Sequence, residues 1–160
     1  MYCSRMPDPQ DKLLQIIANL QTADECEIME KNATARARHD LAVAARKRAL
    51  ELRALAYGAS TAAERECLEA IYAYEQVLTV KNGKKTSASR TWPMVKRYGI
   101  IGAVERAVNR SEETVGYTAL RDMGLEDYAF EAVILRYADS NLFSAEAIAR
   151  SQARVSDRKH

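Results

Sequence analysis

The chain has 160 residues, of which 29% are charged, and its formal net charge at pH 7 is only +2. This length suits one compact domain, or a core with one protruding element, and is sufficient to bury a core without cross-links. The three cysteines are widely spaced and form no Cys-x-x-Cys pair, which argues against a disulfide framework and a zinc site. No apolar run approaches about eighteen residues and the N-terminus lacks a signal-peptide pattern, so we expect a cytoplasmic protein without a membrane span.

The first part of the chain predicts long helices. Asp8 and Pro9 have the pattern of a helix start, with an N-cap followed by proline at the first helical position. Residues 23–57 contain neither glycine nor proline. They predict one long helix, or two helices with a joint near residues 31–32, and Gly58 predicts the end of this segment.

A further long helix is predicted between Thr61 and the turn signal Asn-Gly at 82–83. Thr61 and Glu64 have the spacing of a capping box. Two long helices joined at residues 58–60 should form an antiparallel hairpin, so we assign residues 1–80 to a long helical hairpin. Its apolar stripe is narrow, and a homodimer through the long helices is an alternative that the pattern leaves open.

The elements beyond a basic loop at residues 81–89 are shorter and richer in apolar residues. Pro93 lies in the first turn of a helix that Gly99 should stop. Further helices are predicted at residues 100–110, 111–123, 125–137 and 145–155. No segment alternates with period two for long. The sequence therefore predicts an all-α fold, in which the hairpin is followed by a compact bundle of short helices at 90–155 and a tail at 156–160.

The region around Gly99 has some features of a helix-turn-helix. Met94 and Tyr98 fit the apolar contacts of the first helix when Gly99 is placed at the turn. However, Glu105 then occupies a position that should be buried and apolar, and Gly102 weakens the second helix. We therefore favour a short helix pair with no role in binding DNA as a helix-turn-helix.

No catalytic, cofactor or metal site is predicted. The Gly-Lys-Lys-Thr run at 83–86 resembles the end of a phosphate-binding loop, but it lacks the upstream glycine and follows a helix instead of a strand. His39 has no partner that faces it, and the cysteines have no supporting histidine. The carboxylates between residues 122 and 131 are explained by helix caps and salt bridges.

Charge is distributed unevenly along the second half of the chain. Residues 81–110 contain eight basic side chains and one acidic side chain, which gives +7. Our first hypothesis is a non-enzymatic protein that contacts nucleic acid through the loop and helix at 81–97. Phosphates would be held by basic residues and a base would stack on the tryptophan, using Lys81, Lys84, Lys85, Arg90, Trp92, Lys96 and Arg97. Arg106 and Arg110 are set aside, because the acidic residues that follow can pair with them.

Residues 111–148 contain eight carboxylates and two arginines, which gives −6. This acidic block supports an alternative hypothesis, in which the chain is a protein-binding inhibitor or adaptor of a host defence or nucleic-acid-processing complex, similar to an anti-CRISPR protein. The block would mimic nucleic acid and occupy a basic groove of the partner. The residues assigned to this contact are Glu112, Glu113, Glu126 and Asp127. An enzyme assembled from residues distant in the sequence is the third hypothesis.

Residues 81–154 resemble a C-terminal region of helical proteins from proteobacteria and from their plasmids or prophages. The resemblance lies in Lys-Asn-Gly-Lys-Lys-Thr at 81–86, Ser-Arg-Thr-Trp at 89–92, Lys-Arg-Tyr-Gly-Ile-Ile at 96–101, Gly-Tyr-Thr-Ala-Leu at 116–120 and Phe-Glu-Ala-Val at 130–133. It covers less than half of the chain. It implies a bacterial or mobile-element setting, and no activity is associated with it.

Overall fold

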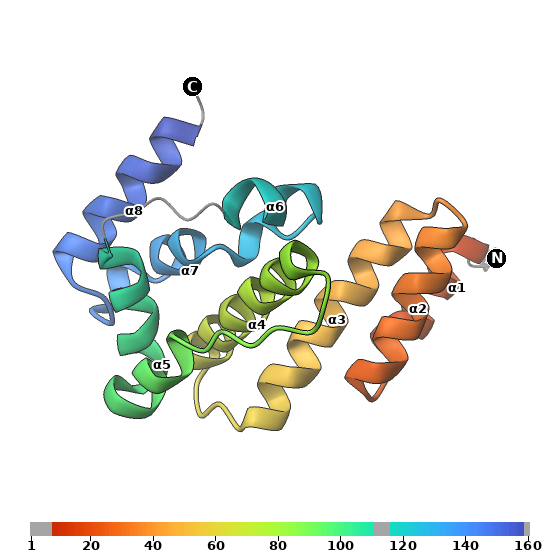
Figure 1. Ribbon diagram of the computed structural model, residues 1–160, viewed down its shortest axis with the longest axis horizontal. Helices are drawn as coiled ribbons and strands as arrows, with labels where there is room; N and C mark the ends of the chain where they lie inside the picture. Colours follow the sequence, from red (N-terminus) through yellow and green to blue (C-terminus); the bar gives the residue numbers. More distant parts are fainter. Residues whose placement is uncertain (1–7, 111–115, 159–160) are drawn as a thin grey trace, which may run out of the picture. The chain divides into compact units, whose positions relative to one another are not determined.

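The computed structural model describes residues 8–110 and 116–158, and within these ranges the chain forms eight α-helices, two 3-10 helices and no strand (Figure 1). The predicted all-α class is confirmed. None of the described helices is both long enough and apolar enough to cross a membrane. The elements are α1 (Pro9–Ala18), α2 (Ala23–Ala35), α3 (His39–Tyr57), α4 (Ala62–Asn82), α5 (Thr91–Asn109), α6 (Gly116–Asp122), η1 (Glu126–Tyr128), α7 (Phe130–Arg136), η2 (Ala138–Ser140) and α8 (Ala145–Arg158).

The chain forms two compact units, Met1–Arg53 and Ala54–His160. Helix α3 contributes to both of them. The antiparallel hairpin stays a prediction. So does the predicted division of the chain into residues 1–80, 81–89, 90–155 and 156–160.

The first unit contains α1, α2 and most of α3. The Asp8 side chain accepts a hydrogen bond from the Gln10 N–H and Pro9 occupies the first turn of α1, as predicted. Two ion pairs link α2 to α3: Arg46 lies 2.8 Å from Glu30 and Arg53 lies 2.6 Å from Glu27. The small core of this unit consists of Ile17, Ala33, Leu41, Ala42 and Ala45.

Residues 23–57 form two helices, and their joint lies at residues 36–38 instead of near 31–32. Ala37 has the left-handed φ of 56°. The Arg38 N–H donates to the Ala33 carbonyl at 2.8 Å and the Ala37 N–H donates to the Thr34 carbonyl at 3.0 Å. These two bonds around a left-handed residue form a Schellman motif, which ends α2 without the glycine that normally marks such a cap.

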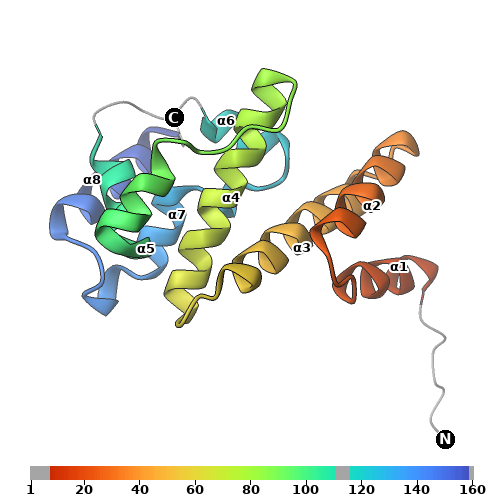
Figure 2. The ribbon, with the colours of Figure 1, turned by 60° about the horizontal axis from the view of Figure 1, so that its bottom comes forward.

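The second unit begins with α4, whose ends agree with the sequence. The Thr61 side chain accepts from the Glu64 N–H at 3.1 Å, and the Glu64 carboxylate accepts from the Ser60 N–H at 3.0 Å. Gly83 ends the helix with a φ of 69°. Helix α4 packs against α5 and α7, and α8 packs against α5 and α7 (Figures 1 and 2).

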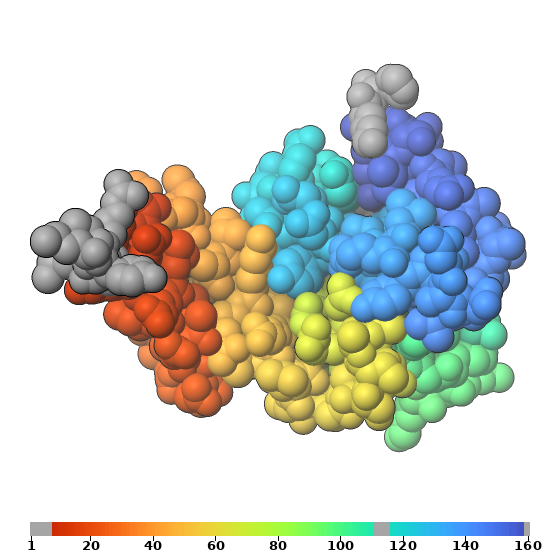
Figure 3. All heavy atoms as spheres, turned by 180° about the vertical axis from the view of Figure 1, so that it is seen from behind, coloured from red at the N-terminus to blue at the C-terminus, as the bar shows by residue number. Residues whose placement is uncertain are grey.

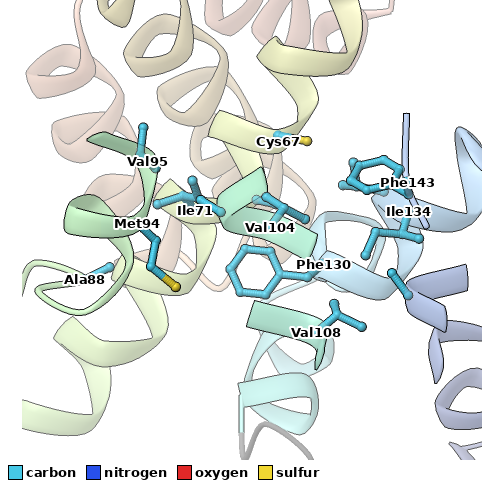
Figure 4. Close-up of a cluster of buried hydrophobic side chains, with 14 residues drawn as sticks. Cys67, Ile71, Ala88, Met94, Val95, Val104, Val108, Phe130, Ile134 and Phe143 are labelled. Atoms are coloured by element: carbon cyan, nitrogen blue, oxygen red, sulfur yellow. The ribbon is translucent and has the colours of Figure 1, made fainter. Parts of the chain in front are cut away.

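The core of the second unit lies between these four helices (Figure 4). Its members come from every helix that surrounds it, and most are less than 2% exposed. They include Cys67 and Ile71 of α4, Met94, Val104 and Val108 of α5, Phe130 and Ile134 of α7, and Phe143 and Ala147 at the start of α8. This apolar core holds α5 in place.

Helix α5 is broken at Gly99, where φ is 82° and ψ is 172°. This backbone conformation is accessible essentially to glycine alone. Pro93 lies in the first turn of the first half. The prediction that Gly99 stops one helix and that another follows directly is confirmed.

Among the elements after α5, the difference from the prediction lies at residues 125–137. Part of the predicted helix at 111–123 lies outside the described residues, and α6 covers its second half. The predicted helix at 125–137 is instead the 3-10 turn η1 followed by α7, because Ala129 is extended, with a ψ of 145°. The Ser144 hydroxyl caps α8 by accepting from the Ala147 N–H at 3.1 Å, as predicted.

Candidate functional site

The basic loop between α4 and α5 is held by hydrogen bonds within itself and to α4. The Thr86 N–H donates to the Thr79 hydroxyl at 3.0 Å, and the Thr86 hydroxyl donates to the Lys84 carbonyl at 2.8 Å. Four basic residues of the predicted site are exposed here: Lys81 in the last turn of α4, Lys84 and Lys85 in the loop, and Arg90 at the N-cap of α5. The loop thus presents its charges on an ordered backbone.

Glu75 of α4 anchors the second half of the loop. One carboxylate oxygen accepts hydrogen bonds from the Ser87 hydroxyl at 2.9 Å, the Ala88 N–H at 2.7 Å and the Trp92 indole N–H at 2.8 Å. Ala88 is 2% exposed, so its N–H requires this acceptor. Glu75 therefore joins the loop and the start of α5 to α4, a role that the sequence did not indicate.

Trp92 is half-buried and its ring is engaged by two tyrosines. The Trp92 ring stacks on Tyr57 with centroids 5.7 Å apart and an interplanar angle of 24°. Tyr72 approaches the ring at 5.2 Å with a tilt of 53°. A nucleic-acid base could stack on Trp92 only in competition with these rings, and the stacking role of Trp92 stays a prediction.

A hollow of about 820 Å³ lies against both halves of α5, on either side of the break at Gly99. Four guanidinium groups line it, from Arg90 and Arg97 before the break and from Arg106 and Arg110 after it. The other lining residues are Pro93, Met94, Tyr98, Gly102, Glu105 and Asn109. With four arginines and one glutamate, the lining has a formal charge of +3.

The arginines of this hollow differ from the others of the described chain in their partners. None of the four has a carboxylate oxygen within 4.0 Å among residues 8–110 and 116–158. Every other described arginine except Arg36 has one, and these are Arg38, Arg46, Arg48, Arg53, Arg65, Arg121, Arg136, Arg150, Arg154 and Arg158. Four of the five described arginines without a carboxylate oxygen within 4.0 Å therefore lie in one hollow.

The carboxylate that lines the hollow, that of Glu105, is hydrogen-bonded to a backbone N–H group. Glu105 accepts a hydrogen bond from the N–H of Ser144, at the start of α8. Two arginines of α8 in turn cap the end of α5, because Arg150 donates to the Asn109 carbonyl at 2.6 Å and Arg154 donates to the Arg110 carbonyl at 2.9 Å. Helix α8 thus fixes the second wall of the hollow.

Tyr98 lines the hollow, and two guanidinium groups lie over its ring. The Cζ atom of Arg106 is 3.5 Å from the centre of the Tyr98 ring, and that of Arg97 is 5.2 Å away. A separation of 3.5 Å is typical of a guanidinium stacked face to face on a ring. This stacking favours one orientation of the Arg106 side chain within the hollow.

The structure brings together some of the predicted site residues and not others. Arg90 and Arg97 line the hollow, and Lys96 is exposed on α5. Lys84 and Lys85 lie in the loop, whereas Lys81, predicted to begin the loop, lies in the last turn of α4. Arg106 and Arg110, which the sequence analysis set aside, belong to the hollow, and no described acidic residue pairs with them. Tyr98 was missed as a candidate contact. Arg106 and Asn109 lie three residues apart on the second half of α5, but the break at Gly99 separates them from Tyr98, so helical spacing could not have indicated this contact.

The acidic block does not form one continuous exposed surface in the described part of the chain. Glu126 and Asp127 are exposed in η1, which lies at the surface on the side shown in Figure 3. Glu131 is 2% exposed and lies 3.2 Å from Arg154 and 3.4 Å from Arg158. Glu112 and Glu113 lie outside the described residues.

Ionisable groups elsewhere in the described chain form no further obvious site. No group of three or more histidines, cysteines, aspartates or glutamates is arranged to hold a metal ion in the ranges 8–110 and 116–158. Burial raises the pKa of the Cys67 thiol to about 12 and also raises the pKa of Cys26. Both side chains are therefore thiols, and not thiolates, near neutral pH.

No protein-family model matches this chain, and no curated protein or solved structure shows detectable similarity to it.

Proposed function

We propose that this protein is a non-enzymatic nucleic-acid-binding protein, and that it contacts phosphates through the loop and helix at 81–97 together with the adjoining hollow. The observation that supports this most strongly is the gathering of four arginines without described carboxylate partners in one hollow beside the basic loop. Guanidinium groups suit this role because their planar donors match phosphate oxygens.

The loop and the hollow would make different contributions to binding. Lys81, Lys84 and Lys85 are exposed and flexible point charges, so they would attract a polyanion from a distance. Arg97 and Arg106 lie against Tyr98, so their donors are already oriented. We expect the lysines to affect mainly the association rate and the arginines to affect mainly the dissociation rate.

The salt dependence of binding tests this proposal. Fluorescence anisotropy of a labelled oligonucleotide would be followed between 50 and 300 mM KCl, conditions chosen to span the range in which released counterions dominate. We expect the logarithm of the association constant to fall linearly with the logarithm of the salt concentration, with a slope of about −0.7 to −0.9 for each phosphate contacted. A salt-independent association, or no retention of DNA or RNA at 50 mM KCl, would rule out the proposal.

The alternative, an inhibitor or adaptor that binds a basic protein groove through its acidic block, has less support. Its surface is interrupted, because Glu131 is buried between two arginines. Under this alternative, charge reversal at Glu126 and Asp127 abolishes association with the protein partner. Under our proposal the same reversal leaves the retention of nucleic acid unchanged.

Four further statements remain proposals. These are the antiparallel packing of the two long helices over residues 1–80, a homodimer formed through them, a cytoplasmic location, and a bacterial or mobile-element setting. Cross-linking of the purified chain followed by mass measurement would test the homodimer.

A further inference from the structure

We propose that the hollow on α5 holds one unstacked nucleotide of a single strand. The base would lie on the stacked pair Arg106–Tyr98, and the adjoining phosphates would be bound by Arg90, Arg97 and Arg110. This inference rests on the proposed function. It goes further, because it predicts that the protein prefers single strands to duplexes and attributes this preference to Tyr98 and Arg106.

The first step of the argument is that the hollow contains a flat stacking surface. Arg106 lies 3.5 Å from the centre of the Tyr98 ring, and Tyr98 is 38% exposed. Proteins that bind single strands stack bases on aromatic rings and on guanidinium planes. Gly102 makes room for this surface, because a Cβ atom at this position would lie only 3.0 Å from the Tyr98 Cβ.

The second step concerns the aromatic residues of this region. The Trp92 indole N–H is bound to Glu75, and its ring is engaged by Tyr57 and Tyr72. The Tyr98 ring lines the hollow, and the guanidinium groups of Arg97 and Arg106 lie over it. The stacking surface that accompanies the arginines is therefore Tyr98 with Arg106.

The third step is the fit of size and charge. A hollow of about 820 Å³ falls in the range of sites that enclose small organic ligands, so it has room for a nucleoside and its phosphate. Glu105 accepts a hydrogen bond from the Ser144 N–H and has none of the four arginines within 4.0 Å, so it does not compete with phosphate oxygens for their guanidinium groups through an ion pair. A base in a duplex would first have to leave its stack, at a free-energy cost that a single strand does not have.

Single-stranded and duplex oligonucleotides of equal length, bound at the same salt concentration, test the inference. We expect the wild-type chain to bind the single strand at least about tenfold more tightly than the duplex. The substitution Arg106→Lys keeps the charge and removes the guanidinium plane, so it should lower single-strand affinity about tenfold and change duplex affinity little. Tyr98→Ala should act in the same direction, and Tyr98→Phe should retain the preference because the ring is kept.

A fluorescent base analogue gives a second readout. The fluorescence of a single strand containing 2-aminopurine should rise when the wild type takes this base out of the stack of its neighbours, and should rise less on binding to Arg106→Lys. Arg36→Lys is the matched control, since Arg36 is the described arginine outside the hollow that also lacks a carboxylate partner. Circular dichroism would verify that each variant is folded.

The two proposals fail in different ways. If the wild type binds neither single strands nor duplexes at low salt, the proposed function is wrong and this inference falls with it. If binding is salt-dependent but equal for the two forms, or if Arg106→Lys and Tyr98→Ala leave the preference intact, the proposed function stands and the assignment of a base to the hollow is overturned.

Discussion

Glu75 determines the position of the basic loop through one carboxylate oxygen. That oxygen accepts from Ser87, from the backbone of Ala88 and from the Trp92 indole, so two elements depend on a single side chain. Charge-assisted hydrogen bonds of this kind are stronger than those between neutral groups. The loop is thereby joined to α4, whose inner face belongs to the core of the second unit.

We predict that Glu75→Ala destabilises the protein by about 1–3 kcal/mol, because the buried Ala88 N–H loses its acceptor. The chain contains one tryptophan, so its fluorescence reports the local change directly. We expect the emission to shift to longer wavelength and the urea midpoint to fall. Glu146→Ala, which removes an exposed pair with Arg150, is the control and should change stability by less than about 1 kcal/mol. Unchanged emission and stability in Glu75→Ala would contradict this role.

Helix ends could be predicted where the sequence has a residue that favours a helix end, such as glycine. Gly124 has a φ of 73°, and a Schellman motif around it ends the α6 segment where the sequence indicated a stop. The same motif at Ala37 could not be foreseen, because alanine is among the best helix formers and gives no end signal. The extended Ala129 likewise interrupts a run of apolar residues that reads as one continuous helix.

At the level of this element, we predict that Ala37→Gly stabilises the protein by about 1 kcal/mol. Alanine is strained at a φ of 56°, whereas glycine adopts this conformation freely. Urea denaturation followed by circular dichroism would measure the change. Ala35→Gly, inside the last turn of α2, should instead be neutral or destabilise by up to about 1 kcal/mol. Equal destabilisation by both substitutions would show that Ala37 is not strained.

The site itself was predicted only in part, for a physical reason. Lysines in the loop and arginines near Trp92 are visible as charge in the sequence, so the basic segment was found. Whether Arg106 and Arg110 are neutralised depends on which carboxylates lie near them in space. The acidic residues that follow Arg110 most closely, Glu112 and Glu113, lie outside the described residues, so this pairing stays a prediction. Glu105 binds a backbone N–H of the α8 start, and Glu131 pairs with Arg154 and Arg158 of that helix.

On the scale of the whole molecule, most described arginines are paired with carboxylates, and four of the five that are not lie in the hollow. In the first unit, Arg46 and Arg53 are matched by glutamates of α2. In the second unit, α8 neutralises Glu131 and caps the end of α5, while the hollow on α5 keeps four arginines without described carboxylate partners. A net charge of +2 therefore conceals a concentrated cationic site.

The central claim is that this hollow binds phosphate, and one comparison of charge-reversal variants tests it most directly. The affinity for a labelled single strand at low salt would be measured for the double variant Arg97→Glu/Arg106→Glu and for Arg36→Glu. We predict that the double variant loses at least about a hundredfold in affinity, whereas Arg36→Glu stays within about threefold of the wild type. An equal loss in both variants, or no loss in the double variant while it remains folded, would contradict the claim.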